Sequence, residues 1–307
     1  MENNETPQKI KKSYALPLGS KAGGLSYSAL VILNLLVSLV ASFIIVFCSL
    51  QKTEIENYIS LLISPVAVAI ILTLALTVTK QPAKSLLPLK TSPKYYLIAL
   101  LIVFGALFSL SWINDGIVEL LELIGYTRRD GFIPDVTGWK IIPALIVVAV
   151  IPAVMEEIMF RGILLNNIEG EVGSINAVFI SGFCFSLYHG SVEQTVYQFI
   201  VGCLFGLIAV RSRSIAPTVI IHFINNALII ILLACGLYDE AGTLIISSGG
   251  QIALYVLSAA SLVGGVIWLI LDKTELKKPV RGSVKKFFLF AAAGIAVMAL
   301  MWIIGLF

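Results

Sequence analysis

Long apolar runs follow one another through almost the whole of this 307-residue sequence, and they limit the folds that it can adopt. A helix needs about 20 mainly apolar residues to cross the hydrocarbon core of a bilayer. We predict about nine membrane helices, with eight as the alternative because the fifth and sixth runs are short. The runs lie at residues 28–50, 58–79, 96–113, 141–165, 175–190, 195–210, 216–235, 251–271 and 287–307.

The balance of residue types supports the same class of fold. Charged residues make up 13% of the sequence and apolar residues 58%, whereas about 25% of the residues of a soluble domain are charged. Because lipid offers the backbone no hydrogen-bond partners, such runs satisfy their N–H and C=O groups as helices. The sequence therefore predicts an all-α polytopic membrane protein. Membrane lipid is an expected partner, and the net charge of +3 is too small to indicate nucleic acid.

Lysine and arginine gather in alternate loops, which predicts how the chain is oriented. If the N-terminus lies in the cytoplasm, sixteen of the 21 basic residues fall in cytoplasmic segments and four in outer ones. We therefore expect an integral protein of a bacterial cell membrane with a cytoplasmic N-terminus. The segment 166–174 departs from this pattern because it carries Glu169 and Glu171 and no basic residue.

The chain divides into four consecutive parts. A polar, basic segment at 1–27 is expected in the cytoplasm, and the apolar run after it is expected to be a retained helix rather than a cleaved signal. Residues 28–140 hold three helices and an amphipathic connector at 115–126 that is expected in the membrane interface. Residues 141–235 hold four helices with the buried polar residues, and 236–307 hold the last two.

Three charged residues stand inside the fourth apolar run, where they are costly. Each charged side chain at the centre of a membrane helix costs about 2.5–3.5 kcal/mol on insertion scales. Glu157 and Arg161 are four residues apart, so we expect them to share a helix face and form a supporting ion pair. Glu156 points about 100° away from that face and is the free reactive group. Pro152, one turn earlier, is expected to kink the helix.

Both histidines of the chain follow in later apolar runs. His189 ends the fifth run, and His222 lies in the seventh, with Asn226 one turn later on the same face. Glu156 and His189 lie at similar distances from the intervening turn, so a hairpin brings them to similar depth. We predict that these four residues meet in a polar pocket among helices four, five and seven. A lone histidine in a membrane helix more often joins helices by a hydrogen bond, but here both accompany a buried acid pair.

These residue types are suited to hydrolysis by an activated water. A carboxylate in a low-dielectric site can act as a general base, and a neighbouring imidazole can share the proton or orient the water. A second imidazole and an amide nitrogen can donate hydrogen bonds to a developing oxyanion. This favoured mechanism requires no cofactor. Alternatively, Glu156, His189 and His222 could bind zinc as a His₂Glu set with an open fourth position.

Three short motifs carry these residues in order between about 141 and 230. They read Glu156-Glu157-x-x-x-Arg161, Phe185-x-x-x-His189 and His222-x-x-x-Asn226. The set resembles the CAAX protease and bacteriocin-processing family (CPBP, also called Abi), the type II CAAX prenyl endopeptidase-like intramembrane proteases. The resemblance implies an all-helical membrane endopeptidase in which Glu156 activates water with His189 as its partner. It also implies that His222 and Asn226 stabilise the oxyanion while Glu157 and Arg161 hold the site together.

The resemblance further implies a peptide or protein substrate with a hydrophobic or lipidated end. Arg211 and Arg213 indicate that the seventh helix starts on the cytoplasmic side, so we expect cleavage toward that face. A non-catalytic bacteriocin-immunity or binding protein with the same pocket is the alternative from another class. A proton-coupled transporter is a third hypothesis, although the sequence shows no inverted repeat. Gly202-x-x-x-Gly206 in the sixth run predicts close helix packing.

Overall fold

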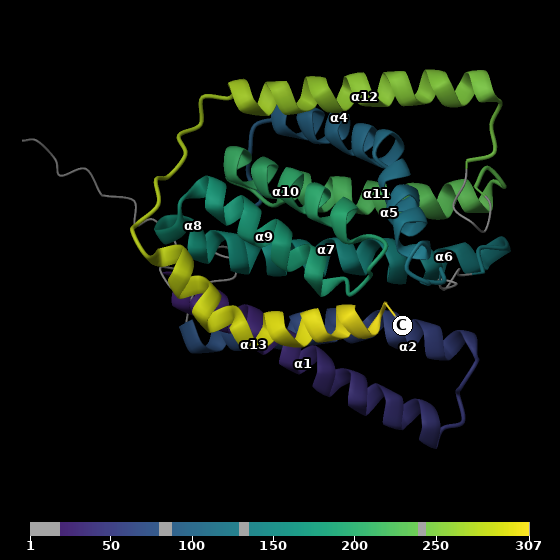
Figure 1. Ribbon diagram of the computed structural model, residues 1–307, viewed down its shortest axis with the longest axis horizontal. Helices are drawn as coiled ribbons and strands as arrows, with labels where there is room; N and C mark the ends of the chain where they lie inside the picture. Colours follow the sequence, from purple (N-terminus) through teal and green to yellow (C-terminus); the bar gives the residue numbers. More distant parts are fainter. Residues whose placement is uncertain (1–18, 80–87, 129–134, 239–243, 307) are drawn as a thin grey trace, which may run out of the picture.

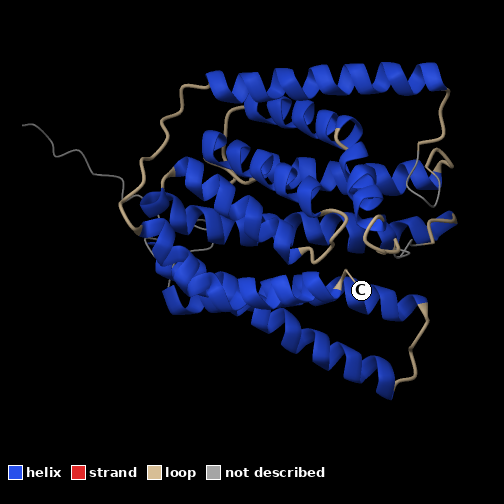
Figure 2. Ribbon diagram, in the orientation of Figure 1, coloured by secondary structure: helices blue, strands red, loops and turns tan. Residues whose placement is uncertain are grey.

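The computed structural model describes residues 19–79, 88–128, 135–238 and 244–306, and the regular structure in these ranges is helical, with no β-strand (Figure 2). Eight helical segments of this part of the chain are long and apolar enough to cross a membrane. The fifth predicted run forms a shorter apolar helix, α9 (Ser174–Tyr188). The predicted all-α polytopic membrane fold is confirmed. The number of membrane helices is eight without the short helix α9 and nine with it.

The helices form three layers (Figure 1). At the top of the view α12 packs along α4, and at the bottom α1 packs against α13 and α2. The segment 138–234 lies between these layers and carries the predicted polar residues. The bounds of the outer helices are Gly19–Phe47 for α1, Glu54–Thr79 for α2, Lys94–Ser109 for α4, Ser248–Leu271 for α12 and Ser283–Ile304 for α13.

In the middle layer a long helical rod precedes the α9–α10 hairpin. Two π-helical stretches, η2 and η3, flank the short helix α7 within this rod. Single π-helical turns widen a helix and are frequent at functional sites. Pro152 lies in the first turn of α7, directly after η2, and the kink predicted there stays a prediction. The bounds are Gly138–Lys140 for η1, Ile141–Ala144 for α6, Leu145–Val150 for η2, Ile151–Glu157 for α7, Ile158–Leu165 for η3, Asn166–Val172 for α8, Thr195–Ser212 for α10 and Ala216–Ala234 for α11.

The first membrane helix begins earlier than its apolar run, because α1 starts at Gly19 whereas the run starts at residue 28. Small residues explain the early start, since they allow this polar turn of α1 to press against other helices. A side chain at Gly24 would meet the backbone carbonyl of Phe287 in α13 at 2.5 Å. Part of the predicted cytoplasmic segment is therefore packed into the bundle, and its residues 1–18 lie outside the described residues.

The predicted amphipathic connector is the helix α5 (Trp112–Glu122). Arg128, which follows it, lies 3.0 Å from Asp115 of α5 and 3.9 Å from Glu193 in the loop between α9 and α10. The connector is thus joined to the loop that follows the second motif.

The α9 and α10 backbones touch, as the spacing of two glycines in α10 predicts. A Cβ at Gly202 would lie 2.9 Å from Cα of Gly182, and one at Gly206 would lie 3.4 Å from Cα of Val178. The first distance is shorter than a Cβ contact allows, so position 202 requires glycine. The predicted close packing is confirmed, and it fixes α10 against α9.

The acidic segment that departs from the charge pattern forms the helix α8, and bases from other loops neutralise its acids. Glu169 is 3% exposed and accepts hydrogen bonds from Arg213 at 2.8 Å and from Lys277 at 2.6 Å. Glu171 accepts a hydrogen bond from the backbone of Ser20 at the start of α1 at 2.9 Å. The start of α1, the turn after α10 with Arg213 and the loop after α12 with Lys277 therefore lie together at one end of the protein, which we call the basic end.

We expect Glu169→Gln to lower thermal stability, because the neutral amide replaces the carboxylate that Arg213 and Lys277 bind. A hydrogen bond to a charged group contributes about 1.5–3 kcal/mol, and the partial exposure of both bases reduces that, so a loss of about 1–2 kcal/mol is expected. Thermal unfolding of the purified protein in detergent measures the change. Glu275→Gln removes an exposed acid of the same region and is the control. Equal losses in the two variants would contradict this role of Glu169.

Candidate active site

The helix that carries the acids is anchored to α11 near its proline. Pro152 has no N–H and cannot bond to the carbonyl of Val148, four residues earlier, as α-helical geometry would require. Asn226 of α11 donates from Nδ2 to that carbonyl at 3.1 Å. Its Oδ1 accepts a hydrogen bond from Nδ2 of Asn225 at 3.1 Å. The carboxamide of Asn226 is thus held from both sides.

Glu157 and Arg161 form the ion pair that their spacing predicts. Nη1 of Arg161 lies 2.7 Å from Oε1 of Glu157, and both side chains are fully buried. Nη2 of Arg161 donates to the carbonyl oxygen of Gly202 at 3.0 Å. The guanidinium also lies 4.6 Å from the ring centre of Phe185 and 5.4 Å from that of Phe205. One cation therefore ties the acidic helix to both α9 and α10.

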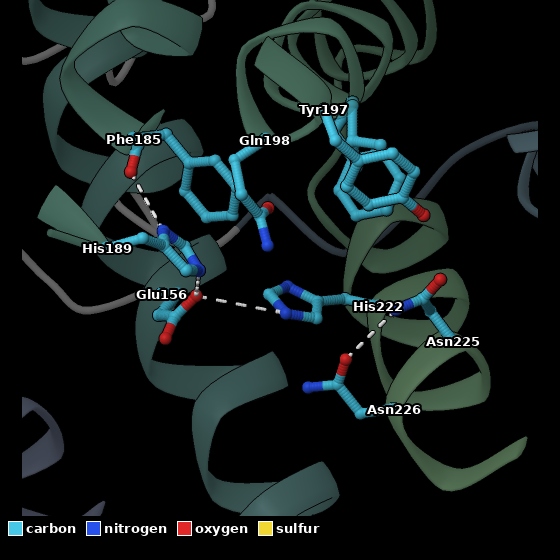
Figure 3. A pocket seen from close by; sticks show the side chains of 10 residues that line it. Glu156, Phe185, His189, Tyr197, Gln198, His222, Asn225 and Asn226 are labelled. Atoms are coloured by element: carbon cyan, nitrogen blue, oxygen red, sulfur yellow. Dashed lines mark hydrogen bonds and ion pairs between the residues drawn. The ribbon is translucent and has the colours of Figure 1, made fainter. Parts of the chain in front are cut away.

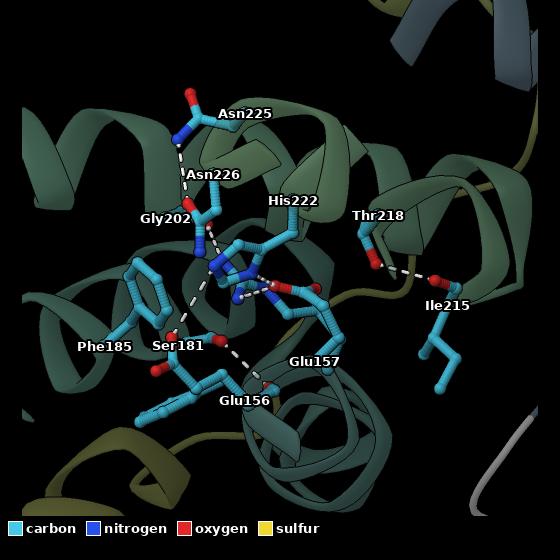
Figure 4. Close-up of polar contacts among 12 residues, drawn as sticks. Glu156, Glu157, Ser181, Phe185, Gly202, Ile215, Thr218, His222, Asn225 and Asn226 are labelled. Carbon is cyan, nitrogen blue, oxygen red and sulfur yellow. Dashed lines mark hydrogen bonds and ion pairs between the residues drawn. The ribbon is translucent and has the colours of Figure 1, made fainter. Parts of the chain in front are cut away.

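Glu157 also fixes the ring of His222. Oε1 of Glu157 lies 3.0 Å from Nδ1 of His222 (Figure 4). Because this oxygen already accepts from Arg161, Nδ1 of His222 is the donor and carries a proton. Nε2 of His222 is then the ring nitrogen left for the cavity, with a lone pair when the ring is neutral. Spacing along the chain predicts the pair with Arg161 but gives no indication of this second bond, which crosses between helices.

His189 caps the C-terminal end of α9, where the chain turns at Gly190 with φ +62°. Nδ1 of His189 lies 2.9 Å from the carbonyl oxygen of Phe185, and since a carbonyl only accepts, this nitrogen also carries a proton. The ring of Phe185 packs against the imidazole with its centre 4.5 Å away. Nε2 of His189 is therefore directed toward Glu156.

Glu156 faces both histidines across a cavity (Figure 3). Its Oε2 lies 3.8 Å from Nε2 of His189 and 3.8 Å from Nε2 of His222. These distances are longer than hydrogen bonds, and Oε2 is buried without a hydrogen-bond partner among the described residues. The adjoining cavity of about 80 Å³ has room for several water molecules. The structure thus brings together the four residues predicted to line one pocket, Glu156, His189, His222 and Asn226.

Three hydrogen-bond acceptors converge on this cavity when both rings are neutral. They are Oε2 of Glu156 and the Nε2 atoms of His189 and His222, since each ring has committed its Nδ1 proton elsewhere. Lone pairs that face one another repel, so the trio favours a hydrogen-bond donor such as water, or a cation, among its members. A water that donates to Glu156 while it contacts an imidazole meets this requirement.

The same three side chains form the alternative zinc set. Their donor types suit zinc, whose ligands lie about 2.0–2.2 Å from the ion and therefore about 3.3 Å from one another in a tetrahedron. The carboxylate oxygen lies 3.8 Å from each Nε2, which is wider than that spacing. Within the described ranges, no group of three or more His, Cys, Asp and Glu side chains is arranged to hold a metal ion.

The cavity has one wall that the sequence did not reveal. α10 contributes Tyr197, Gln198, Val201 and Phe205, and α11 adds Asn225. A glutamine in an otherwise apolar run is the signal that could have marked Gln198. Nothing in the local spacing indicates that α10 faces the acids.

Fold and site together define a class of protein. It is an all-helical membrane protein in which a carboxylate and two imidazoles surround a cavity enclosed by helices. Residues 138–228 match the family described as type II CAAX prenyl endopeptidase Rce1-like. This range includes all three motifs.

The chain is also similar to the membrane-embedded CAAX protease MroQ of Staphylococcus aureus (strain USA300). The two are 28% identical over 193 residues, which cover 60% of this chain and 77% of that protein. Both matches support the CAAX protease family, a family of membrane endopeptidases. No solved structure matches the sequence.

Arg161→Ala is expected to lower both the folded yield and the activity. Removal of one partner from a buried ion pair costs about 3–5 kcal/mol, because the other charge stays buried without compensation. Size-exclusion chromatography in detergent measures the folded fraction. Arg161→Lys keeps the charge but not the paired contacts with Glu157 and Gly202, so it should fall between the wild type and Arg161→Ala. A fully folded, fully active Arg161→Ala protein would show that the pair supports nothing.

Proposed function

We propose that the chain is an intramembrane endopeptidase that hydrolyses a peptide bond with a water activated by Glu156. The observation that carries this proposal is the position of Oε2 of Glu156, 3.8 Å from Nε2 of both His189 and His222 beside a cavity. A carboxylate with space for water beside it is what general base catalysis needs. The match of residues 138–228 to the type II CAAX prenyl endopeptidase Rce1-like family and the similarity to MroQ support the endopeptidase class.

Glu156 takes a proton from the water as the water oxygen attacks the carbonyl carbon of the scissile bond. His189 orients this water through Nε2, because its Nδ1 is committed to the carbonyl of Phe185. The electron pair of the carbonyl π bond moves to the oxygen, which becomes an oxyanion. The reaction forms no covalent bond between the protein and the substrate.

His222 and Asn226 stabilise that oxyanion. The donor form of His222 is the doubly protonated ring, with Nδ1–H held by Glu157 and Nε2–H directed into the cavity. Asn226 gives one hydrogen of Nδ2 to the carbonyl of Val148 and has a second available. Glu157 and Arg161 act as positioning residues, since they hold the ring of His222 in place.

The tetrahedral intermediate then collapses. Its C–N bond breaks, the electron pair goes to nitrogen, and the proton held by Glu156 passes to the leaving amine. The new carboxylic acid gives its remaining proton to the amine, so one water is consumed, the products end in a carboxylate and an ammonium group, and Glu156 returns to its ionised form.

The substrate class that suits this position is a peptide with a hydrophobic or lipidated end. Thirteen residues of continuous helix separate Glu156 from Glu169 at the basic end, so the cavity lies well below the charged loops. Such a peptide can enter that apolar zone with little cost. From the positive-inside rule we propose that the basic end lies in the cytoplasm, and that the cell is bacterial, so cleavage and product release are directed there.

Glu156→Gln should abolish cleavage of a quenched hydrophobic peptide by the purified protein while it leaves the fold intact. A general base contributes about 10²–10⁴-fold, so a loss of at least 10²-fold is expected. Glu119→Gln, an exposed acid in α5, is the matched control and should keep full activity. Equal rates for Glu156→Gln and the wild type would remove the proposed mechanism. A wild-type protein that binds the peptide without cleaving it would instead support the non-catalytic alternative.

Exhaustive chelation is expected to leave the rate unchanged, because the proposed base acts on water directly. The measurement is the peptide cleavage rate before and after chelation and after addition of Zn²⁺. Activity that disappears on chelation and returns with Zn²⁺ would overturn the metal-free mechanism and support Glu156, His189 and His222 as zinc ligands.

A further inference from the structure

One side chain of the cavity wall has no role in the mechanism described above. Gln198 projects from α10 into the space between the two imidazoles, on the side opposite Glu156 (Figure 3). Its neighbours along α10 from Phe199 to Val210 are apolar or glycine. An amide side chain on such a helix is costly in a membrane unless it has a partner there. Gln194, one turn earlier, accepts one long hydrogen bond from Gln198, so a further partner is to be sought in the cavity.

The cavity is short of hydrogen-bond donors. Glu156 presents a bare carboxylate oxygen, and the two histidines present Nε2 because their Nδ1 protons are used by Phe185 and Glu157. An oxyanion that develops in the cavity needs donors, each worth about 10²–10³-fold in kcat. Apart from the doubly protonated ring of His222, the amide groups that line the cavity are the source of such donors.

The amides of α11 are already largely engaged. Asn226 donates to Val148 at 3.1 Å and accepts from Asn225 at 3.1 Å, so its position follows the contact between α11 and the acidic helix. Gln198 is less engaged. Within the described part of the chain, its one side-chain hydrogen bond is from Nε2 to Oε1 of Gln194 at 3.4 Å, close to the upper limit for such a bond. Its second Nε2 hydrogen is free to serve a ligand.

The backbone that carries Gln198 is held rigidly. Gly202, one turn later on the same face, packs on Gly182 of α9 and accepts a hydrogen bond from Arg161. Phe205, one turn further, packs against the ring of His222 with its centre 5.8 Å away. An amide placed from such a rigid helix loses little further freedom when it binds a substrate group.

We infer that Gln198 is a substrate-binding residue of the proposed hydrolysis, and that its Nε2–H donates to the carbonyl oxygen of the scissile bond as that oxygen becomes an oxyanion. This inference rests on the proposed endopeptidase function. The donor lies across the cavity from Glu156, so the water attacks one side of the carbonyl carbon while Gln198 binds the oxygen. His222 and Asn226 then complete the set of donors around the same atom.

The test compares an amide peptide with the same peptide carrying a thioamide at the scissile bond. Sulfur accepts hydrogen bonds more weakly than oxygen, so a donor to this atom favours the amide over the thioamide. Gln198→Met keeps the length of the side chain and removes the amide. We expect kcat/KM for the amide peptide to fall about 10²-fold, mainly in kcat, and the amide-to-thioamide ratio to fall at least about 10-fold.

Gln51→Met is the matched control, since it makes the same change at an exposed position between α1 and α2, outside the cavity. It should keep the wild-type ratio and a rate within about 2-fold of the wild type. Gln198→Leu provides a second apolar variant if Gln198→Met does not fold. An active wild type with an unchanged ratio in the folded Gln198 variant overturns the inference alone, even if both rates fall. A wild type that cleaves neither peptide overturns the proposed function, and the inference with it.

Discussion

The hydrogen bonds to one carboxylate oxygen, Oε1 of Glu157, hold the centre of this protein together. That oxygen accepts from Arg161 at 2.7 Å and from His222 at 3.0 Å, and the acid has no exposed surface. A buried charge is tolerated only when it is compensated, so Arg161 must be present, and Arg161 in turn needs the carbonyl of Gly202. These contacts fix the acidic helix, α10 and α11 in position relative to one another. Glu156, next along the helix, is turned about 100° from Glu157 and is left facing the cavity.

Close backbone contact makes this arrangement possible. Gly182 and Gly202 bring α9 and α10 together, which places the Gly202 carbonyl within reach of the guanidinium. On the other side, Pro152 frees a carbonyl that Asn226 of α11 binds at 3.1 Å. The features that weaken regular helices are thus the features that join the helices around the site. They also restrict how far the cavity walls can move, which favours a preorganised site.

The charged groups outside the site obey the same requirement for compensation. Glu169 breaks the charge pattern of its own segment, yet Arg213 and Lys277 reach it from two other loops. Asp272 repeats the pattern at the end of α12. Burial opposes its ionisation, but hydrogen bonds from Lys94, Thr274 and Tyr95 hold the pKa of Asp272 well below its usual range. Its contribution to stability is therefore present above the ordinary pKa of an aspartate and is lost as the pH falls through the lowered value. The charged residues of the basic end thus form a network of ion pairs, and the candidate active site lies well away from that network.

Local patterns in the sequence determined the helices of this protein and one ion pair of its site. Run lengths gave the helices, and the four-residue spacing gave the ion pair of Glu157 and Arg161, because both depend on the geometry of a single helix. The three motifs indicated the family and the residues that meet at the cavity. Only the tertiary structure decided which histidine nitrogen faces Glu156, what holds Asn226, and that Gln198 of α10 completes the wall. Those features depend on contacts between helices far apart in the chain, and hydrophobic periodicity specifies a buried face without specifying which helix it meets.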